Sequence, residues 1–255
     1  MKRITYFVFL LFLLCLPAQA AINEMSFTSD TMQYDLAAGR FYAEGNVTIK
    51  GRDIVIIATK ANGNVGSRTF NLSGNITING TWNGDNVKLS AMSATAEFSE
   101  QPIYTLESGI NGSLGKITID CDYLQMIGDR ISAKNVRKLQ DQKAGITFSA
   151  ANIKGIINNG ELTQAEADNN IVIKGKPDKR GGVVELKGNK AIYSIDRGTV
   201  VMSGGVSATQ NRRTLNAESL VYIPSTNRIE ASGQRTRITV NIDDENLPSP
   251  PQNNE

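Results

Sequence analysis

Apolar and polar residues alternate with a period of two along most of the chain between Ser26 and Ile242. Two segments show the pattern most clearly, and their apolar positions are Phe41, Ala43, Val47 and Ile49 in the first and Phe70, Leu72, Ile76 and Ile78 in the second. Successive side chains of a β-strand point to opposite faces of a sheet, so the pattern predicts strands with one apolar and one solvated face. No convincing helical periodicity accompanies it, and the sequence therefore predicts an all-β protein.

Gly and Asn separate the strand-like runs. Asn-Gly occurs at residues 62, 79, 83, 111 and 159, and Gly-Gly occurs at 181 and 204. These dipeptides adopt the positive φ angles that two-residue hairpins require, so we expect tight turns there and antiparallel neighbours. Gly45 and Asn46 interrupt the alternation of the first segment, which predicts a bulge or bend.

One spacing, Tyr-x4-Gly/Asn-x5-Gly, occurs three times without gaps. The copies are Tyr34, Gly39 and Gly45, then Tyr193, Gly198 and Gly204, then Tyr222, Asn227 and Gly233. Each copy predicts a strand that ends near the Tyr, a turn at the Gly or Asn, and a return strand that kinks at the second Gly. Because one hairpin cannot bury its apolar face alone, the repetition predicts stacked hairpins.

The two ends of the chain differ from this pattern. Lys2 and Arg3 precede an apolar run at residues 4–16, and small residues at 18 and 20 give a cleavage site after Ala20, as in a secretory signal peptide. The run is shorter than the roughly 20 residues of a membrane-spanning helix, so we expect a cleaved signal at 1–20, with an uncleaved anchor as the alternative. The β-domain is then expected over 21–242, and the acidic, Pro-rich residues 243–255 are expected to form a disordered tail.

The amino-acid composition limits the kinds of catalytic and binding site that the chain can form. The chain has no histidine, which excludes His-based triads and His-ligated metals, and we expect no catalytic residue, metal or cofactor. Without Lys2 and Arg3 the basic and acidic residues number 25 each, unlike the basic footprint of a nucleic-acid binder. Cys121 would remain as a lone thiol, interpreted as a buried structural residue. Asp120 and Asp122 are the best carboxylate pair, and a solvated strand face is the expected explanation.

The apolar strand face is therefore the candidate functional feature. If such faces meet, the interior either packs with its own side chains or holds an apolar guest. The candidate lining consists of the two segments above together with Val200, Met202 and Val206.

The repeat-bearing segments "FTSDTMQYDLAAGRFYAEGNVTIKGRDIVIIATKA" and "LKGNKAIYSIDRGTVVMSGGVSATQNRRTLNAESLVYIPSTNRIEASG" resemble the OstA-like domain of the LptA family of lipopolysaccharide-transport proteins. The matching positions are Ser29, Asp30, Tyr34, Gly45, Val47, Ala217, Tyr222, Ser232 and Gly233. The match covers both ends of the expected domain, whereas residues 82–160 match only in strand rhythm.

The resemblance implies a twisted, open-ended antiparallel β-jellyroll in the periplasm. It implies a non-catalytic bridge that carries lipopolysaccharide from the inner to the outer membrane with its acyl chains in an apolar groove. The implied partners are membrane-bound proteins that share the domain and further copies of the chain, joined end to end through edge strands. The exported chain is longer than a minimal bridge protein, which implies an extended or duplicated domain. A structural or adhesive surface β-solenoid is the alternative, and a polysaccharide-cleaving β-solenoid ranks last.

Overall fold

A computed structural model describes residues 26–51, 53–82, 84–97, 99, 101–177, 182–211, 213–233 and 236–240. The expected signal peptide and the expected tail lie outside these residues. The described residues form sixteen strands and no helix: β1 Ser26–Thr28, β2 Thr31–Asp35, β3 Arg40–Lys50, β4 Ile54–Asn64, β5 Thr69–Trp82, β6 Asp85–Glu97, β7 Ile103–Leu114, β8 Ile117–Ile127, β9 Arg130–Asp141, β10 Ile146–Asn158, β11 Glu161–Pro177, β12 Val183–Ser194, β13 Thr199–Gln210, β14 Arg213–Ile223, β15 Arg228–Ser232 and β16 Arg237–Val240. No helix long and apolar enough to cross a membrane occurs within the described ranges.

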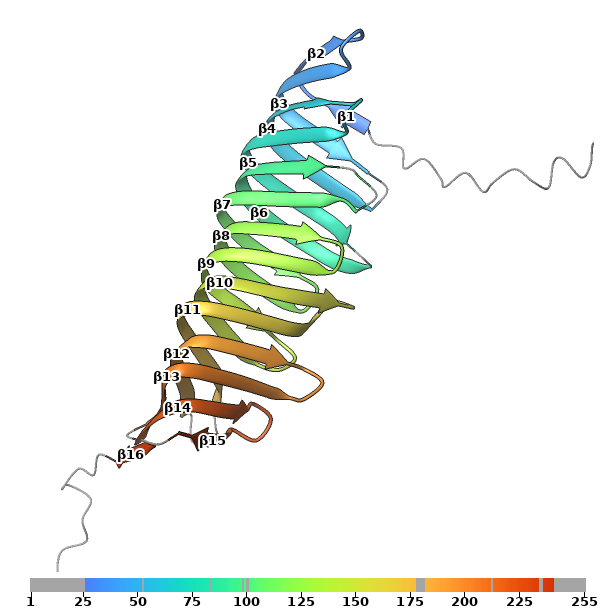
Figure 1. The fold of residues 1–255 in the computed structure, drawn as a ribbon. Coiled ribbons are helices and arrows are strands. Elements are labelled where there is room, and N and C mark those ends of the chain that lie inside the picture. The colour runs from blue at the N-terminus through green and yellow to red at the C-terminus, as the bar shows by residue number, and fades with distance from the viewer. Residues whose placement is uncertain are drawn as a thin grey trace, which may run out of the picture.

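All strands belong to one antiparallel sheet whose strand order follows the chain from β3 to β15. The result is a long stack, with the first strands at one end and the last at the other (Figure 1). At each end the final layer is split into two short strands: β1 and β2 both pair with β3, and β15 and β16 both pair with β14. The predicted fold class is confirmed, since the chain forms a twisted, open-ended antiparallel β-jellyroll built from successive hairpins.

A bulge near the middle of every odd-numbered strand from β3 to β13 bends the sheet. At each bulge the odd strand has one residue more than its even-numbered neighbours. On β3, for example, two residues separate Glu44 from Val47, whereas one residue separates their partners Lys60 and Ala58 on β4. The bulge residues with positive φ are Gly45 and Asn46, Gly74 and Asn75, Ser108 and Gly109, Asn135, Asn169 and Asn170, and Gly204 and Gly205. Bulges bend and twist a strand locally, so a column of them folds the sheet along one line.

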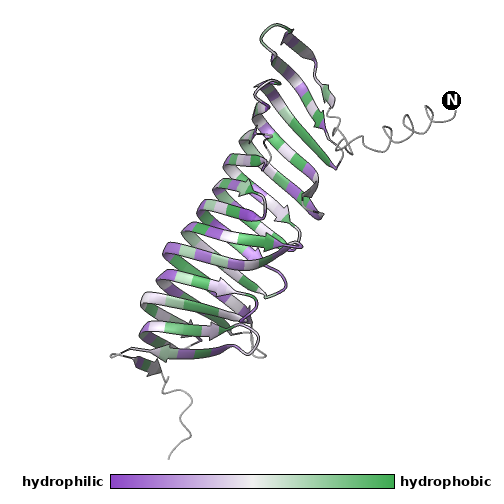
Figure 2. Cartoon of the chain, turned by 45° about the vertical axis from the view of Figure 1, so that its right-hand side comes forward, coloured by the Kyte–Doolittle hydropathy of each residue, from purple (hydrophilic) through white to green (hydrophobic). Residues whose placement is uncertain are grey.

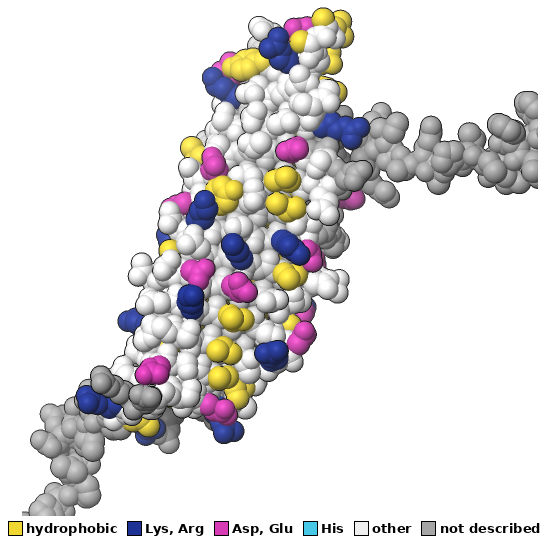
Figure 3. Space-filling view, viewed as in Figure 1, with side chains coloured by type: hydrophobic (Ala, Val, Ile, Leu, Met, Phe, Trp, Pro, Cys, Tyr) yellow, Lys and Arg dark blue, Asp and Glu magenta, His cyan; other side chains and the backbone are white. Residues whose placement is uncertain are grey.

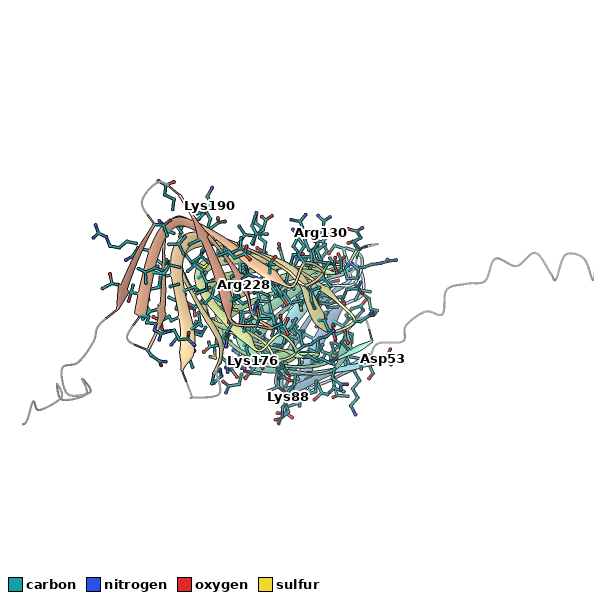
Figure 4. The ribbon with its side chains drawn as sticks, turned by 90° about the horizontal axis from the view of Figure 1, so that it is seen from below. Asp53, Lys88, Arg130, Lys176, Lys190 and Arg228 are labelled. Atoms are coloured by element: carbon teal, nitrogen blue, oxygen red, sulfur yellow. The ribbon has the colours of Figure 1, made fainter. Side chains whose placement is uncertain are left out.

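The bend divides the sheet into two facing walls. The first wall ends at the connections that follow even-numbered strands, and their described residues, at 36–39, 65–68, 99, 101–102, 128–129, 159–160, 195–198 and 224–227, are called the first rim. The second wall ends at the connections that follow odd-numbered strands, and their described residues, at 51, 53, 84, 115–116, 142–145, 182 and 211, are called the second rim. Viewed from below, Lys190 and Arg130 of the first wall lie opposite Lys88 and Asp53 of the second (Figure 4).

The expectation of tight turns at every Asn-Gly is wrong in three of its five places. Residues 159–160 connect strands and Gly84 lies in a turn, with residue 83 outside the described residues, but the Asn-Gly pairs at 62, 79 and 111 lie inside β4, β5 and β7. The second Gly-Gly pair, Gly204 and Gly205, lies at the β13 bulge. Close packing explains one of the exceptions, because a Cβ at Gly112 would collide with the backbone of Lys88 on the neighbouring strand.

The three repeated hairpins occupy equivalent places in the sheet. Gly39, Gly198 and Asn227 end their turns with positive φ, while Gly45 and Gly204 lie at bulges and Gly233 follows β15. The tyrosines pair in the same register, with Tyr34 opposite Phe41, Tyr193 opposite Val200 and Tyr222 opposite Ile229. Burial separates them, because Tyr34 is 49% exposed whereas Tyr193 and Tyr222 are buried.

Candidate functional site

The inner face of the bent sheet is the candidate site. Hydrophobic and hydrophilic positions alternate along the strands (Figure 2), and the hydrophobic ones turn toward the space between the walls. The candidate lining residues on β3, β5 and β13 are all buried there: Phe41, Ala43, Val47, Ile49, Phe70, Leu72, Ile76, Ile78, Val200, Met202 and Val206.

These candidate residues do not form one local pocket. The residues of β3 and β5 lie near the N-terminal end, and those of β13 lie beyond seven intervening strands near the other end. One continuous cluster of buried apolar residues, which extends from β3 to β14, joins the two groups. The sequence reasoning missed most of its central part, including Leu106, Ile110, Ile119, Leu124, Leu139 and Phe148. The same alternation in "KITIDCDYLQM", at 116–126, would have revealed the part of the cluster on β8.

An aromatic cluster joins the walls at the N-terminal end. Phe27 of β1 lies on the second wall, with its ring centroid 5.3 Å from that of Phe41 and 5.6 Å from that of Phe70, both on the first wall. Gly63 makes room for these rings, because a Cβ there would contact both Phe41 and Phe70. Such tilted and offset pairs add to the stabilisation from area burial. Phe27 thus covers the interior where the stack begins.

The central interior contains one buried acidic group, Asp141, at the end of β9. Its carboxylate accepts hydrogen bonds from the backbone amides of Lys143 at 2.9 Å and Ala144 at 3.0 Å, and from the Tyr193 hydroxyl at 3.3 Å. Burial, reinforced by the negative charge of Asp141, raises the pKa of Tyr193 well above its usual value, so this hydroxyl remains a donor. Tyr193 also packs against Phe148, with ring centroids 5.7 Å apart.

Cys121 and the flanking carboxylates face opposite ways. The Cys121 thiol is buried and donates to the carbonyl of Tyr123, and burial raises its pKa to about 12, so it lacks the thiolate character of a reactive cysteine. Asp120 and Asp122 lie on the outer face, where the Arg137 guanidinium bridges them at 2.6 Å and 2.5 Å. Hydrogen bonding to Arg137 lowers the pKa of Asp122, which is the opposite of what a general acid needs.

On the side of the molecule shown in Figure 3, charges of both signs are interspersed rather than gathered into a region of one sign. Within the described residues no group of three or more His, Cys, Asp or Glu side chains could hold a metal ion. The protein thus has an apolar inner face and a solvated outer face with charges of both signs. Such an inner face can bind an apolar group by removing it from water, without forming a covalent bond.

Fold and interior together define an open-ended β-jellyroll with an apolar inner face. Residues 16–80 match the family model described as "Lipopolysaccharide-assembly, LptC-related", and residues 16–25 of that match precede the described part. The resemblance to lipopolysaccharide-transport proteins predicted from the sequence is thereby confirmed.

Among solved structures, the chain is similar to LptH from Pseudomonas aeruginosa, described as the LptA homologous periplasmic component of the conserved lipopolysaccharide transport device. The identity is 12%, the match covers 87% of this chain and 96% of LptH, and the TM-score is 0.25. At that TM-score the LptH coordinates add nothing to the geometry described above. Comparison with curated proteins finds no match.

Proposed function

We propose that this chain is a non-catalytic periplasmic carrier that holds the acyl chains of lipopolysaccharide between its walls as the lipid passes from the inner to the outer membrane. The continuity of the apolar interior carries the proposal. Every strand from β3 to β14 contributes buried apolar side chains, and Asp141 is the single buried polar residue among those described. The match of residues 16–80 to the LptC-related family supports the same function.

The energetics of acyl chains suit such an interior. Removing each methylene group from water is favourable by about 0.8 kcal/mol, so an apolar face that runs the length of the molecule can hold a lipid without covalent chemistry. Because the gain is nearly uniform along the face, the lipid can shift by small steps.

The proposal includes partners at the ends of the stack. β2 pairs only with β3 and exposes Met32 at 46% and Tyr34 at 49%, and Leu36, which directly follows β2, is 88% exposed. An edge strand with apolar side chains suits the addition of a strand from another molecule. The partner would be an end strand of another copy or of a membrane-bound protein with the same domain.

The alternative is a structural or adhesive surface β-solenoid with a permanently packed interior. The packing of the central section favours it, because Leu106, Ile119 and Leu139 are 0–1% exposed without any guest. The two functions differ in whether lipid ever reaches these side chains.

Photo-crosslinking in cells distinguishes the lipid carrier from the packed solenoid. Photo-leucine, a small diazirine analogue, replaces the buried Val47 or Ile76, and the outward-facing neighbours Thr48 and Thr77 serve as controls. We expect lipopolysaccharide adducts at the first pair and none at the second. Adducts at neither pair, in a folded and exported protein, would favour the packed solenoid.

A further inference from the structure

The two rims meet along a seam that closes the interior on the side opposite the bend. At its centre Gly115 and Lys116 of the second rim contact the β10–β11 turn of the first rim. The backbone amide of Lys116 donates to the carbonyl of Gly160 at 3.0 Å, and a Cβ on Gly115 would collide with the Gly160 backbone. The β7–β8 and β10–β11 connections, about 45 residues apart in the chain, are thus in direct contact.

One carboxylate holds two lysines of the second rim at this point. Glu161, the first residue of β11, accepts from Lys116 Nζ at 2.9 Å and from Lys143 Nζ at 2.5 Å. The side chains of the two lysines are 58% and 55% exposed, whereas that of Glu161 is 19% exposed. We call Lys116, Lys143, Glu161 and Gly160 the clasp.

Further contacts continue the seam toward the C-terminal end. Asp141 of the second wall accepts from Tyr193 of the first, and the Asn227 side chain donates to the carbonyl of Lys176 at 3.4 Å. Tyr222, whose hydroxyl donates to Asn227, lies against Gly175.

The seam and the bend differ in how firmly they join the walls. At the bend every strand from β3 to β14 passes covalently from one wall to the other, flanked by ladder hydrogen bonds. At the clasp one backbone hydrogen bond and two ion pairs cross the gap, and the ion pairs contribute little to stability because both lysine side chains are more than half exposed. Opening the walls at the seam therefore breaks no covalent bond and no ladder hydrogen bond between strands, whereas opening them at the bend would break both.

The closed walls leave no exposed inner surface for a lipid in the central section. Ile110, Ile119 and Leu124 are fully buried with the clasp formed. An acyl chain can lie among them only when the walls separate, and separation at the seam would leave a polar headgroup in solvent beside the rims.

We propose that the seam is a lateral entrance for the lipid and that Glu161 is its latch. The entrance lies between the β7–β8 and β9–β10 connections on one side and the start of β11 on the other. Its occupant is one amphipathic lipid, with the acyl chains inside and the headgroup between the rims. This inference rests on the proposed carrier function.

A reversible disulfide across the seam tests the entrance. In a Cys121→Ala background, Lys116→Cys and Glu161→Cys place a cysteine on each rim, and photo-leucine at Ile119 reports lipid beneath the clasp. The purified protein is incubated with lipopolysaccharide in its oxidised and reduced forms. Thr118→Cys with Gln140→Cys, partners on neighbouring strands of one wall, provides a matched disulfide that does not cross the seam.

We expect adduct formation to fall at least tenfold in the oxidised seam pair and to be unchanged in the control pair. Equal adducts in both forms of the seam pair would show entry through the ends of the stack and overturn the lateral entrance alone. No adduct at Ile119 or Ile76 in the protein without a disulfide would overturn the carrier function itself, and the entrance with it.

A second measurement is independent of the disulfide. Glu161→Gln keeps the shape of the latch and removes its charge, so the Lys116 amide is expected to exchange its proton three- to tenfold faster while the Leu124 amide, in the middle of β8, is unaffected. Adduct formation at Ile119 is expected to accelerate similarly. Unchanged exchange at Lys116 together with an unchanged adduct rate would show that Glu161 is not the latch.

Discussion

Tyr34 and Tyr193 occupy the same place in the same hairpin repeat, yet one is 49% exposed and the other 2%. Tyr193 lies on β12 between β11 and β13, with Asp141 and Phe148 of the second wall opposite. Tyr34 lies on β2, which has a neighbour on one side only. The repeat places an inward-facing ring at each of these positions, and the strands on both sides of it bury the ring. Tyr34 is therefore exposed because β2 has no further strand beyond it.

The largest expected effect distinguishes the two tyrosines directly. Tyr193→Ala removes a buried ring and leaves a cavity, and we expect it to lower the free energy of unfolding by about 3–5 kcal/mol. Tyr34→Ala removes a half-exposed ring, and we expect a loss below about 0.5 kcal/mol. Urea titrations followed by circular dichroism measure both. Similar losses for the two variants would contradict the difference in burial.

A smaller effect is expected from the aromatic cluster over the N-terminal interior. Phe27→Ala removes the contacts with Phe41 and Phe70, and we expect a loss of about 2 kcal/mol confined to the first layers. Hydrogen exchange of β3 amides should accelerate at least tenfold while β12 amides are unchanged. Equal acceleration in β12 would mean that the whole sheet opens as one cooperative unit.

The exposed edge at Tyr34 should matter for association rather than for folding. Tyr34→Glu places a charge on the edge strand, and we expect it to weaken end-to-end association about tenfold, which corresponds to about 1.4 kcal/mol. Analytical ultracentrifugation measures the change. Val201→Glu, on the outer face of β13 where Val201 is 41% exposed, is the control and should leave association unchanged. A weaker self-association in the control as well would point to a general effect of charge.

The smallest effect is expected on the outer face of the central section. Arg137→Gln breaks the bridge to Asp120 and Asp122, all of them solvent-exposed side chains, and we expect no resolvable shift of the urea midpoint. A clear destabilisation would indicate that these outer charges support the bulge at Asn135.

Much of the fold could be predicted from local patterns. Alternation at Phe41, Ala43 and Val47 predicts the inner face, and the interruption at Gly45 and Asn46 predicts a bulge because both signals act within one strand. The expectation of tight turns failed inside β4, β5 and β7, because Asn-Gly also suits places where neighbouring backbones crowd together, as at Gly112.

The contacts across the seam could not be predicted from the sequence. Lys116 and Glu161 meet only because a column of bulges bends the sheet and brings two connections three strands apart together. No spacing rule links Lys116 with Glu161. Nothing in the sequence distinguishes them from lysines and glutamates that are simply exposed to solvent. The different surroundings of Tyr34 and Tyr193 likewise depend on the number of layers on either side, which the repeat itself does not encode.

The strands lie in the sheet in the same order as in the chain, and this order affects both the folding and the evolution of the protein. Each hairpin pairs with its neighbours in the chain, so folding can begin at any hairpin and spread in both directions with short loop closures. A gene segment that encodes two strands and one bulge can be duplicated or deleted without rethreading any other part of the sheet. The length of the molecule is therefore an adjustable dimension on which selection can act.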